Sequence, residues 1–264
     1  MSKKNDLPLV SVITVSYNAA STIEDTIRSV ISQTYPNIEY IIIDGASTDG
    51  TVDIIKKYEK HISYWVSEPD NGIYDAMNKG LKVARGEYIG ILNADDVYIP
   101  MAIEISIDKI KESSVDYSIA NVELVDKNLI LRPIIPLKNK IYQEMPYPHV
   151  TAIIARYVYD DVGYFDTSFN IAGDHDMALR ILKKNYRYVY IDQVIGFLKS
   201  GGISDSFNSS RESLRVAIKN GKHWLTAYIT FIYHKINFVL RNNLPHPIVR
   251  IIRLIKRSRC ESKE

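Results

Sequence analysis

The chain has 264 residues, of which 46% are apolar and 24% charged, and its formal net charge is +2 at pH 7. This composition allows a packed core, excludes wholesale disorder, and is not typical of a nucleic-acid-binding protein. The single cysteine, Cys260, excludes an intrachain disulfide, which fits a reducing compartment. The first residues lack the pattern of a signal peptide, and no run of about 20 uncharged apolar residues occurs, so we expect a cytoplasmic protein.

Hydrophobic patterning predicts strands and helices that alternate through the first hundred residues. Ser21 and Glu24 have the spacing of a capping box at the start of the first helix. Alternation of this kind implies a Rossmann-like α/β fold, with a mostly parallel sheet and helices on both of its faces. The expected strands are 9–15, 38–44, 62–68 and 87–92, and the expected helices are 21–33, 51–60 and 72–84.

The pattern changes after Val115, where two strands follow each other without a helix between them. A proline-broken stretch comes next, followed by a short helix and a further strand. The expected elements of this second half are strands at 116–124, 128–136 and 186–191 and a helix at 174–185.

Polar and acidic side chains follow several of the expected strands of the first half. Ligands of open α/β sheets bind at the carboxyl ends of the strands, so these side chains are candidates for a site. A single acidic residue after a strand is more often a turn former or a helix cap, but repetition at several strand ends favours a site. The residues concerned are Tyr17, Asn18, Asp44, Glu68 and the stretch 93–96.

Asp95 and Asp96 stand together where the apolar run 88–92 ends. Adjacent carboxylates repel each other, and a hard cation such as Mg²⁺ or Mn²⁺ offsets this repulsion. Such an ion typically takes one or two carboxylates plus substrate phosphates. The chain has neither the glycine-rich dinucleotide fingerprint nor a P-loop, and the loop after its first strand, "SYNAAST", has no glycine and no basic residue. Phosphates bound here would therefore have to be held by a metal.

Two segments carry a family resemblance. "SVITVSYNAASTIEDTIRSVISQTYPNIEYIIIDGASTDGT" (11–51) and "GEYIGILNADD" (86–96) resemble glycosyltransferase family 2, of the bacterial surface-polysaccharide type, over about residues 8–205. The resemblance implies a GT-A fold in one domain, 1–205. Its nucleotide-binding half would span about 8–115 and its acceptor half about 116–205, with a helical, basic extension at 206–264.

The resemblance also assigns donor-side residues. The end of the first strand and the acidic residue after the second would hold the nucleotide, which implies roles for Val15, Tyr17, Asn18 and Asp44. The family's Asp-x-Asp-Asp metal pattern has Asn93 in its first position here, which leaves Asp95 as the expected ligand with Asp96 beside it. "SEPDNGIYDAMNKG" (67–80) resembles a subset of the family. It places Glu68, Asp75, Asn78 and Lys79 around the sugar nucleotide, with a solvated helix face as the alternative.

The family's catalytic base lies in a Glu-Asp pair that opens a late helix. "GDHDMALR" (173–180) resembles that segment, with Asp174 at the position of the base, Gly173 in place of the Glu, and Asp176 as the second candidate. Plain N-terminal capping of the helix is the alternative for these aspartates. The stretch "PHVT" (148–151) supplies His149 on the sugar or acceptor side.

The function that the resemblance implies is inverting, metal-dependent transfer of a hexose from a UDP-linked donor to an acceptor hydroxyl. A lipid-linked saccharide of a surface polysaccharide such as O-antigen is the expected acceptor. One alternative is a sugar nucleotidyltransferase, which would need a glycine-rich basic loop after the first strand. The other is a non-catalytic carbohydrate-binding relic, against which the intact Asp44, Asp95, Asp96 and Asp174 argue.

The C-terminal region has a basic, amphipathic pattern. Residues 224–240 are mostly apolar, and a helix over 246–260 would gather isoleucines on one side and arginines on the other. This pattern is typical of a helix that lies in the interface of an anionic membrane, with packing on the enzyme's own core as the alternative. We therefore expect a peripheral protein on the cytoplasmic face of the membrane. The residues are Ile248, Ile251, Ile252 and Ile255 against Arg250, Arg253 and Arg257.

Overall fold

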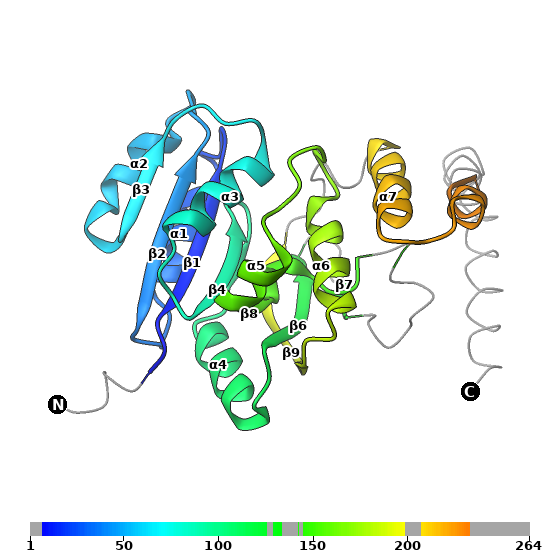
Figure 1. Cartoon of the computed structure of the whole chain (residues 1–264). Helices are drawn as coiled ribbons and strands as arrows, with labels where there is room; N and C mark the ends of the chain where they lie inside the picture. Colours follow the sequence, from blue (N-terminus) through cyan, green and yellow to red (C-terminus); the bar gives the residue numbers. More distant parts are fainter. Residues whose placement is uncertain (1–6, 126–128, 134–141, 143–144, 199–206, 233–264) are drawn as a thin grey trace, which may run out of the picture.

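The fold was analysed in a computed structural model, which describes residues 7–125, 129–133, 142, 145–198 and 207–232. The amphipathic helix expected at 246–260 lies outside these residues. A single nine-stranded sheet runs through the molecule in the order β3-β2-β1-β4-β8-β6-β9-β5, with β7 paired to β6 (Figure 1). The strands are β1 (Val10–Ser16), β2 (Ile38–Asp44), β3 (Tyr64–Ser67), β4 (Tyr88–Asn93), β5 (Val97–Tyr98), β6 (Tyr117–Leu124), β7 (Leu129–Leu131), β8 (Ile153–Ala155) and β9 (Tyr188–Leu198).

The first four strands form the parallel part of the sheet, as the alternating pattern predicts. β1 pairs in parallel with β2 and β4, and β2 pairs in parallel with β3. The register aligns Ser16 with Asp44, Asp44 with Ser67, and Val15 with Asn93. The polar residues at these strand ends therefore meet at one edge of the sheet.

The second half of the sheet is mixed. β8 is antiparallel to both β4 and β6, β9 is parallel to β6, and β5 closes the edge antiparallel to β9. β9 extends to Leu198, seven residues beyond the expected strand, because it continues past an irregularity in its pairing with β6 to reach β5. The expected α/β architecture, with a parallel first half of the sheet and helices on both faces, is confirmed.

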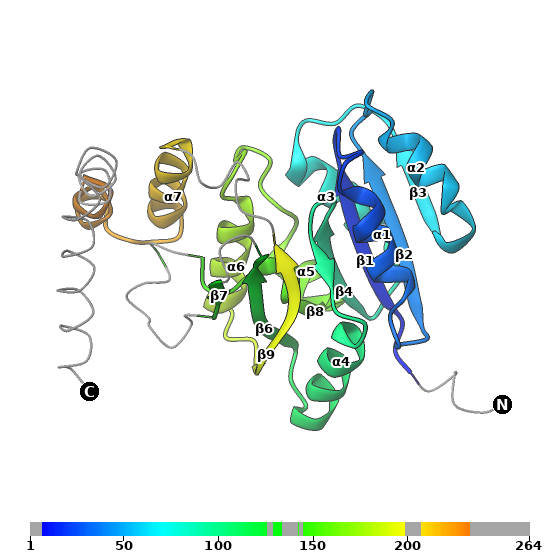
Figure 2. The same ribbon diagram turned by 180° about the vertical axis from the view of Figure 1, so that it is seen from behind.

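Alternate residues of the strands point to two apolar layers, one on each face of the sheet. Val12 and Ile42 pack in one layer with α1, α2 and α4, and Ile13 and Ile41 pack in the other with α3, α5, α6 and α7. Figure 1 and the reverse view in Figure 2 show the helices on both sides. The helices are α1 (Ile23–Ile31), α2 (Thr51–Lys57), α3 (Ile73–Val83), α4 (Ala102–Ser113), α5 (Arg156–Val162), α6 (Gly173–Lys183) and α7 (Phe207–Lys219), with short 3₁₀ turns η1 (Glu59–His61) and η3 (His149–Thr151).

Helix α1 does not begin with the expected capping box. Its N-cap is Thr22, which makes no side-chain capping hydrogen bond. The carboxylate of Glu24 turns outward instead and accepts from Lys57, from Tyr58 at 2.6 Å, and from Arg28. Tertiary partners on α2 and beside it therefore outcompete the local cap.

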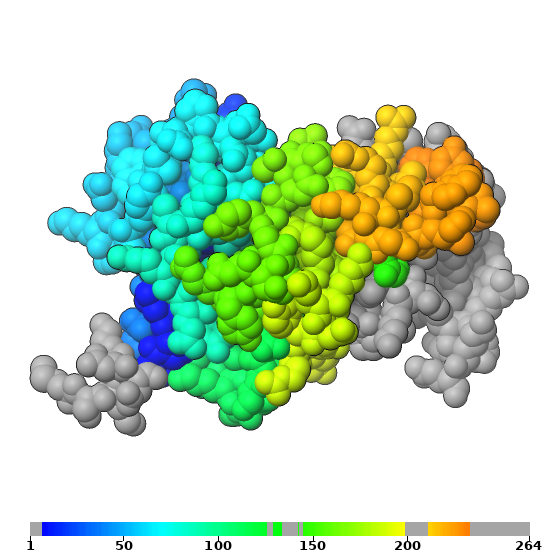
Figure 3. All heavy atoms as spheres, in the orientation of Figure 1, coloured from blue at the N-terminus to red at the C-terminus, as the bar shows by residue number. Residues whose placement is uncertain are grey.

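Helix α7 packs against the sheet domain, although the expected boundary at residue 205 places it in a separate extension. Val216 joins the same apolar layer as α6, and Ala217 and Asn220 are buried. In Figure 3 the orange residues of α7 and of the following helical residues 224–232 lie on the opposite side of the molecule from the cyan and blue residues of the first strands and helices. The domain therefore extends at least through α7.

Candidate active site

Asp44 organises the carboxyl edge of the parallel strands. Its Oδ1 accepts hydrogen bonds from the hydroxyls of Ser16 at 2.9 Å and Ser47 at 2.6 Å. Its Oδ2 accepts from the backbone N–H of Ser47 at 2.9 Å and from the hydroxyl of Ser67 at 2.6 Å. The residue is fully buried, so its carboxylate ties the ends of β1, β2 and β3 together beneath the surface.

The residues around Asp44 differ in what they can offer a ligand. Val15 is buried in the core, and its carbonyl accepts from the N–H of Ala94. Asn18 adopts a left-handed conformation and accepts from the N–H of Thr48, which joins the loops after β1 and β2. Tyr17 is 69% exposed and its ring lies beside Gly45, where it presents an aromatic surface on which a base could stack.

The segment between β3 and α3 is held by its own acidic residues. Lys79 pairs with Glu68 at 2.8 Å and donates to the carbonyl of Pro69 at 2.9 Å. Asp75 accepts from the backbone N–H of Asn71 at 3.0 Å. These contacts shape the segment as a loop with carboxylates at its surface.

Asn78 points away from this loop, although helical spacing predicts one face shared with Asp75 and Lys79. Its amide is buried and makes two hydrogen bonds of 2.9 Å with the backbone of Phe165, one as donor and one as acceptor. Both ends of the amide are engaged, so Asn78 is not available to a ligand at the carboxyl edge of the strands.

The stretch after β4 places its two aspartates differently. Asp95 is exposed, whereas Asp96 is buried and accepts from the amide Nδ2 of Asn93 at 3.1 Å. Burial, together with the charge of Asp95, raises the pKa of Asp96 to about 8. The exposed carboxylate of Asp95 is therefore the one available to a solvent-side ligand.

These residues fit a hard cation. The buried Oδ1 of Asn93 has no hydrogen-bond partner, and amide and carboxylate oxygens are the ligands that Mg²⁺ and related ions accept. Within the described residues no three His, Cys, Asp or Glu side chains gather into a metal-binding group. A cation beside Asp95 would thus depend on donor phosphates for further ligands.

Asp174 lies at the first turn of α6 in a network of polar side chains. Its Oδ1 accepts from the N–H of His175 at 2.8 Å and lies 3.2 Å from the hydroxyl of Tyr74. Its Oδ2 lies 3.3 Å from Nδ1 of His149, whose Nε2 is 3.4 Å from the amide of Asn93. A continuous chain of side chains therefore joins Asp96, through Asn93 and His149, to Asp174.

Charge and burial oppose each other in this network. Burial raises the pKa of Asp174, but the contacts with His149 and with the N–H of His175 outweigh it, so that the pKa is lowered overall. Burial lowers the pKa of His149, and the carboxylates of Asp174, Asp96 and Asp95 more than offset this, so that its pKa is raised. Asp174 is therefore held ionised at neutral pH, as a general base must be.

Asp176, the second candidate for the base, faces the other way. It is fully buried, and its oxygens bind Arg180 at 2.9 Å, Lys219 at 3.0 Å and the amide of Asn220 at 2.9 Å. Both oxygens are engaged in structural contacts. Of the two candidates, only Asp174 retains exposed side-chain surface.

Helix α7 supports the start of α6 through Glu212, a residue that the sequence motifs do not mark. The N-cap of α6, Ala172, has no side-chain capping bond. The carboxylate of Glu212 accepts instead from the backbone N–H groups of Asn170, Ile171 and Ala172, at 2.7 to 3.1 Å. In the sequence, Glu212 is one acidic residue within an amphipathic helical pattern. That pattern gives no sign of a contact with Ala172, 40 positions earlier.

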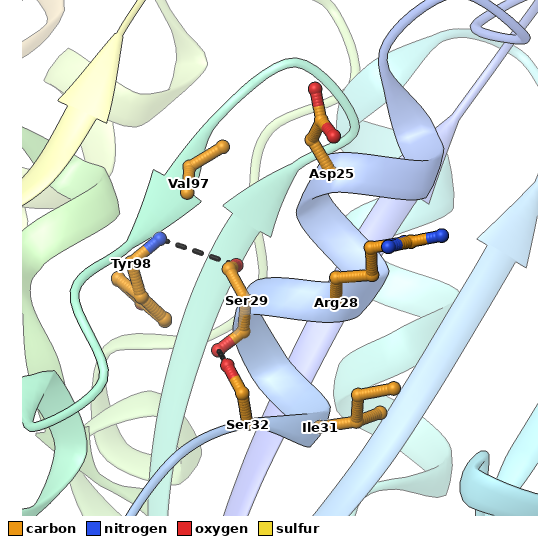
Figure 4. A pocket seen from close by; sticks show the side chains of 7 residues that line it. All are labelled: Asp25, Arg28, Ser29, Ile31, Ser32, Val97 and Tyr98. Atoms are coloured by element: carbon orange, nitrogen blue, oxygen red, sulfur yellow. Dashed lines mark hydrogen bonds between the residues drawn. The ribbon is translucent and has the colours of Figure 1, made fainter.

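An open hollow of about 600 Å³ lies elsewhere, between α1 and β5 (Figure 4). The N–H of Tyr98 on β5 donates to the hydroxyl of Ser29 on α1 across it. None of the expected site residues contributes to its lining, which consists of Asp25, Arg28, Ser29, Ile31, Ser32, Val97 and Tyr98.

Comparison with known protein families identifies the chain. The family model described as glycosyl transferase family 2 matches residues 11–170, which is more than half of the sequence. The chain belongs to glycosyltransferase family 2. The protein is therefore a glycosyltransferase, and the resemblance seen in its motifs is confirmed.

Relatives of this glycosyltransferase have names that refer to teichuronic acid biosynthesis or to a lipid-linked sugar acceptor. TuaG of Bacillus subtilis, named "Putative teichuronic acid biosynthesis glycosyltransferase", is 42% identical over 123 residues, a match that covers 45% of this chain and 48% of TuaG. WfaP of Escherichia coli, named a UDP-Glc:alpha-D-GlcNAc-diphosphoundecaprenol beta-1,3-glucosyltransferase, is 30% identical over 79% of this chain and 84% of its own. The chain thus spans about half the length of TuaG and most of WfaP.

Solved structures with the same fold support the GT-A assignment. S. aureus TarS 1-349 in complex with UDP superposes with a TM-score of 0.66 at 20% identity, over 84% of this glycosyltransferase and 69% of the TarS chain. The mannosyltransferase PcManGT of Pyrobaculum calidifontis, in complex with GDP-Man and Mn2+, superposes with a TM-score of 0.63 at 19% identity, over 94% and 79% of the two chains.

Proposed function

We propose that this protein is an inverting, metal-dependent hexosyltransferase that moves a hexose from a UDP-linked donor to a hydroxyl of a lipid-linked saccharide during surface-polysaccharide synthesis. The observation that carries the proposal is the side-chain network that joins Asp96, the neighbour of Asp95, through Asn93 and His149 to Asp174. It supports a single site in which Asp95 would bind the cation and Asp174 would act as the base. The names of WfaP and of TarS complexes that contain UDP or UDP-GlcNAc support a UDP-linked donor.

Each residue has a defined task in this proposal. The nucleotide would lie over the edge organised by Asp44, with the exposed ring of Tyr17 against its base. Asp174 would remove the proton from the acceptor hydroxyl, and His149 would hold the carboxylate from its Oδ2 side. The acceptor oxygen then attacks the anomeric carbon from the face opposite the diphosphate, so an α-linked donor gives a β-glycoside.

Asp95, with the oxygen of Asn93 nearby, would hold Mg²⁺ or Mn²⁺ together with the donor phosphates. A cation bound there would supply positive charge facing the diphosphate leaving group. The Mn2+ in the PcManGT complex supports this assignment.

A donor and acceptor screen tests the proposed function. Purified protein with Mg²⁺ or Mn²⁺ would be mixed with a panel of UDP-hexoses, beginning with UDP-Glc, and with GlcNAc-diphosphoundecaprenol as acceptor. We expect UDP release that requires the acceptor, and a β-linkage in the product by NMR. An α-linked product would contradict inversion. Folded protein that releases no nucleotide with any donor would support the non-catalytic alternative.

Peripheral attachment to the membrane is part of this proposal, because a lipid-linked acceptor must be reached at the bilayer. Within the described part of the chain no helix has both the length and the apolar character needed to cross a membrane. The helical residues 224–232 expose a large apolar face, in which Trp224 is 61% exposed, shortly before the basic pattern of 246–260. The exposed residues are Trp224, Leu225, Tyr228, Ile229 and Ile232.

Vesicle binding tests this attachment. We expect the full chain to bind anionic vesicles at low salt, to bind more weakly at high salt, and to be released when residues 245–264 are deleted. Trp224→Ser should weaken binding without changing the salt dependence. Binding that is absent at low salt would show that the apolar face serves another contact.

A further inference from the structure

A buried tyrosine reaches the base from the donor-side helix. Tyr74 lies in the first turn of α3, immediately after the loop that Glu68 and Lys79 shape. Its ring stacks on Phe165, with centroids 5.7 Å apart and an interplanar angle of 18°. Its hydroxyl lies 2.7 Å from the carbonyl oxygen of Ile171 and 3.2 Å from Oδ1 of Asp174.

The ring occupies space that a side chain at position 173 would need. A Cβ added to Gly173 would stand 2.7 Å from Cε2 of Tyr74, closer than real Cβ contacts come. Gly173 does not have a positive φ, so its backbone conformation is open to other residues. The absence of a side chain at Gly173 is therefore explained by the approach of the Tyr74 ring to α6.

Helix α3 is fixed against the base side at a second point. One turn after Tyr74, the amide of Asn78 makes its two hydrogen bonds with the backbone of Phe165, the residue on which the Tyr74 ring stacks. The position of the hydroxyl relative to Asp174 is thus set by packing and hydrogen bonds together.

The hydroxyl has one proton and two acceptors. An ionised carboxylate is a stronger acceptor than a backbone carbonyl, so the hydroxyl can donate to Oδ1 while Asp174 is charged. Once Asp174 has taken a proton, the carbonyl of Ile171 can accept the whole hydrogen bond. No buried donor is left unpaired in either state of the base.

We propose that Tyr74 is a positioning residue for the general base. Its hydroxyl holds Oδ1 of Asp174 and favours the ionised carboxylate, which leaves Oδ2, on the side of His149, to take the proton of the acceptor hydroxyl. This inference rests on the proposed function, in which Asp174 is the base. It links the donor-side helix α3 directly to the group that activates the acceptor.

Tyr74→Phe is the central test, because it removes the hydroxyl and retains the stacked ring. We expect kcat to fall roughly tenfold with the donor KM nearly unchanged, as for the loss of one hydrogen bond to a reacting group. The acid limb of the kcat–pH profile should move to higher pH, since a donor to the ionised carboxylate has been lost. Gly173→Ala retains the Tyr74 hydroxyl but displaces the ring. It should also lower kcat and move the acid limb of the kcat–pH profile to higher pH.

Tyr35→Phe is the matched control. Tyr35 is equally buried, and its hydroxyl donates to the carbonyl of Pro8 at 2.6 Å, far from Asp174. This variant should lower the melting temperature while leaving kcat and the pH profile at their wild-type values. An effect of Tyr74→Phe that is confined to stability, as in Tyr35→Phe, would overturn the inference.

The outcomes separate this inference from the proposed function. Loss of transfer in Asp174→Asn together with wild-type kcat and acid limb in Tyr74→Phe would refute the role of Tyr74 alone. Full activity of Asp174→Asn would refute the base itself. If Tyr74→Phe does not fold, Gly173→Ala decides: an unchanged acid limb in that variant would refute the inference.

Discussion

The proposed donor-side edge and the proposed base side of the site are built in different ways. At the donor edge, Asp44 binds Ser16, Ser47 and Ser67, which lie 28, 3 and 23 positions away in the sequence. All three stand at the ends of adjacent parallel strands or in a loop that follows one of them. On the base side, His149 is 56 positions from Asn93, and Tyr74 is 100 positions from Asp174. The donor edge follows from strand register, whereas the base side exists only once the second half of the sheet has brought distant segments together.

The largest effect is expected at the donor side, from removal of the cation. Asp95→Ala, or excess chelator, should reduce transfer to background, because the leaving diphosphate loses its counter-charge. Mg²⁺ or Mn²⁺ should restore the chelated wild type but not the variant. Asp108→Ala, which removes an exposed aspartate from α4, is the control for loss of charge and should remain active. Full turnover in excess chelator would refute the metal assignment.

The next effect separates the two aspartates of α6. Asp174→Asn cannot accept a proton, so we expect kcat to fall by about 10²–10⁴-fold with donor binding nearly unchanged. Asp176→Asn disturbs a buried ion pair with Arg180 and Lys219 and should act on stability, by up to about 3–5 kcal/mol. Calorimetry and single-turnover rates distinguish the two. A folded, inactive Asp176→Asn beside an active Asp174→Asn would reverse the assignment.

The contrast between the two sides explains what the sequence could predict. Each of the first four strands of the structure overlaps its expected range, because alternating apolar runs between turn residues mark buried parallel strands directly. Polar residues at those strand ends could be placed together for the same reason, since the register of parallel strands brings carboxyl ends to one edge.

Contacts across the sheet could not be predicted in this way. Helical spacing predicts that Asn78 shares a face with Asp75 and Lys79. The Asn78 amide instead binds the backbone of Phe165, because the loop before α6 packs against α3. The short elements β5, β8 and α5 were not expected, since runs of two to seven residues carry little periodicity. The roles of Asp174 and Asp176 could not be separated either, because the partners that bury Asp176 include Lys219 and Asn220 at the C-terminal end of α7, more than 40 residues later in the sequence.

A smaller effect should come from the support that α7 gives to the base helix. In Glu212→Gln, an amide replaces one of the oxygens that accept the N–H groups of residues 170–172. We expect a loss of about 2–3 kcal/mol in the free energy of unfolding, and a moderate fall in kcat because Asp174 is two residues beyond this contact. Glu39→Gln is the matched control.

Glu39 is also buried and binds Ser11 and Arg85, but at the opposite end of the strands. Its substitution should cost a similar free energy without lowering kcat. Denaturant unfolding and turnover of both variants make the comparison. If Glu212→Gln and Glu39→Gln lowered kcat equally, Glu212 would affect kcat only through the general stability of the fold, and not through the position of Asp174.

The smallest effect is pH-dependent and concerns the ion pair between Asp166 and Lys219, 2.8 Å long, which joins the loop before α6 to α7. The hydrogen bond from Lys219 and the N–H of Ser168 lower the pKa of Asp166 to about 2. Because this folded-state pKa lies below the ordinary value of about 3.9, the carboxylate stabilises the fold above pH 4, and that contribution is lost as the pH falls through about 2. Asp166→Asn and Lys219→Met should therefore show a coupling energy at pH 7, below about 1 kcal/mol since the pair is partly exposed, and a much smaller one at pH 2, where about half of the folded-state carboxylate is protonated. A double-mutant cycle by denaturant unfolding at both values measures it, and UDP binding at the donor edge should be unchanged throughout. A coupling at pH 2 as large as that at pH 7 would show that packing, and not charge, joins α7 to the loop before α6.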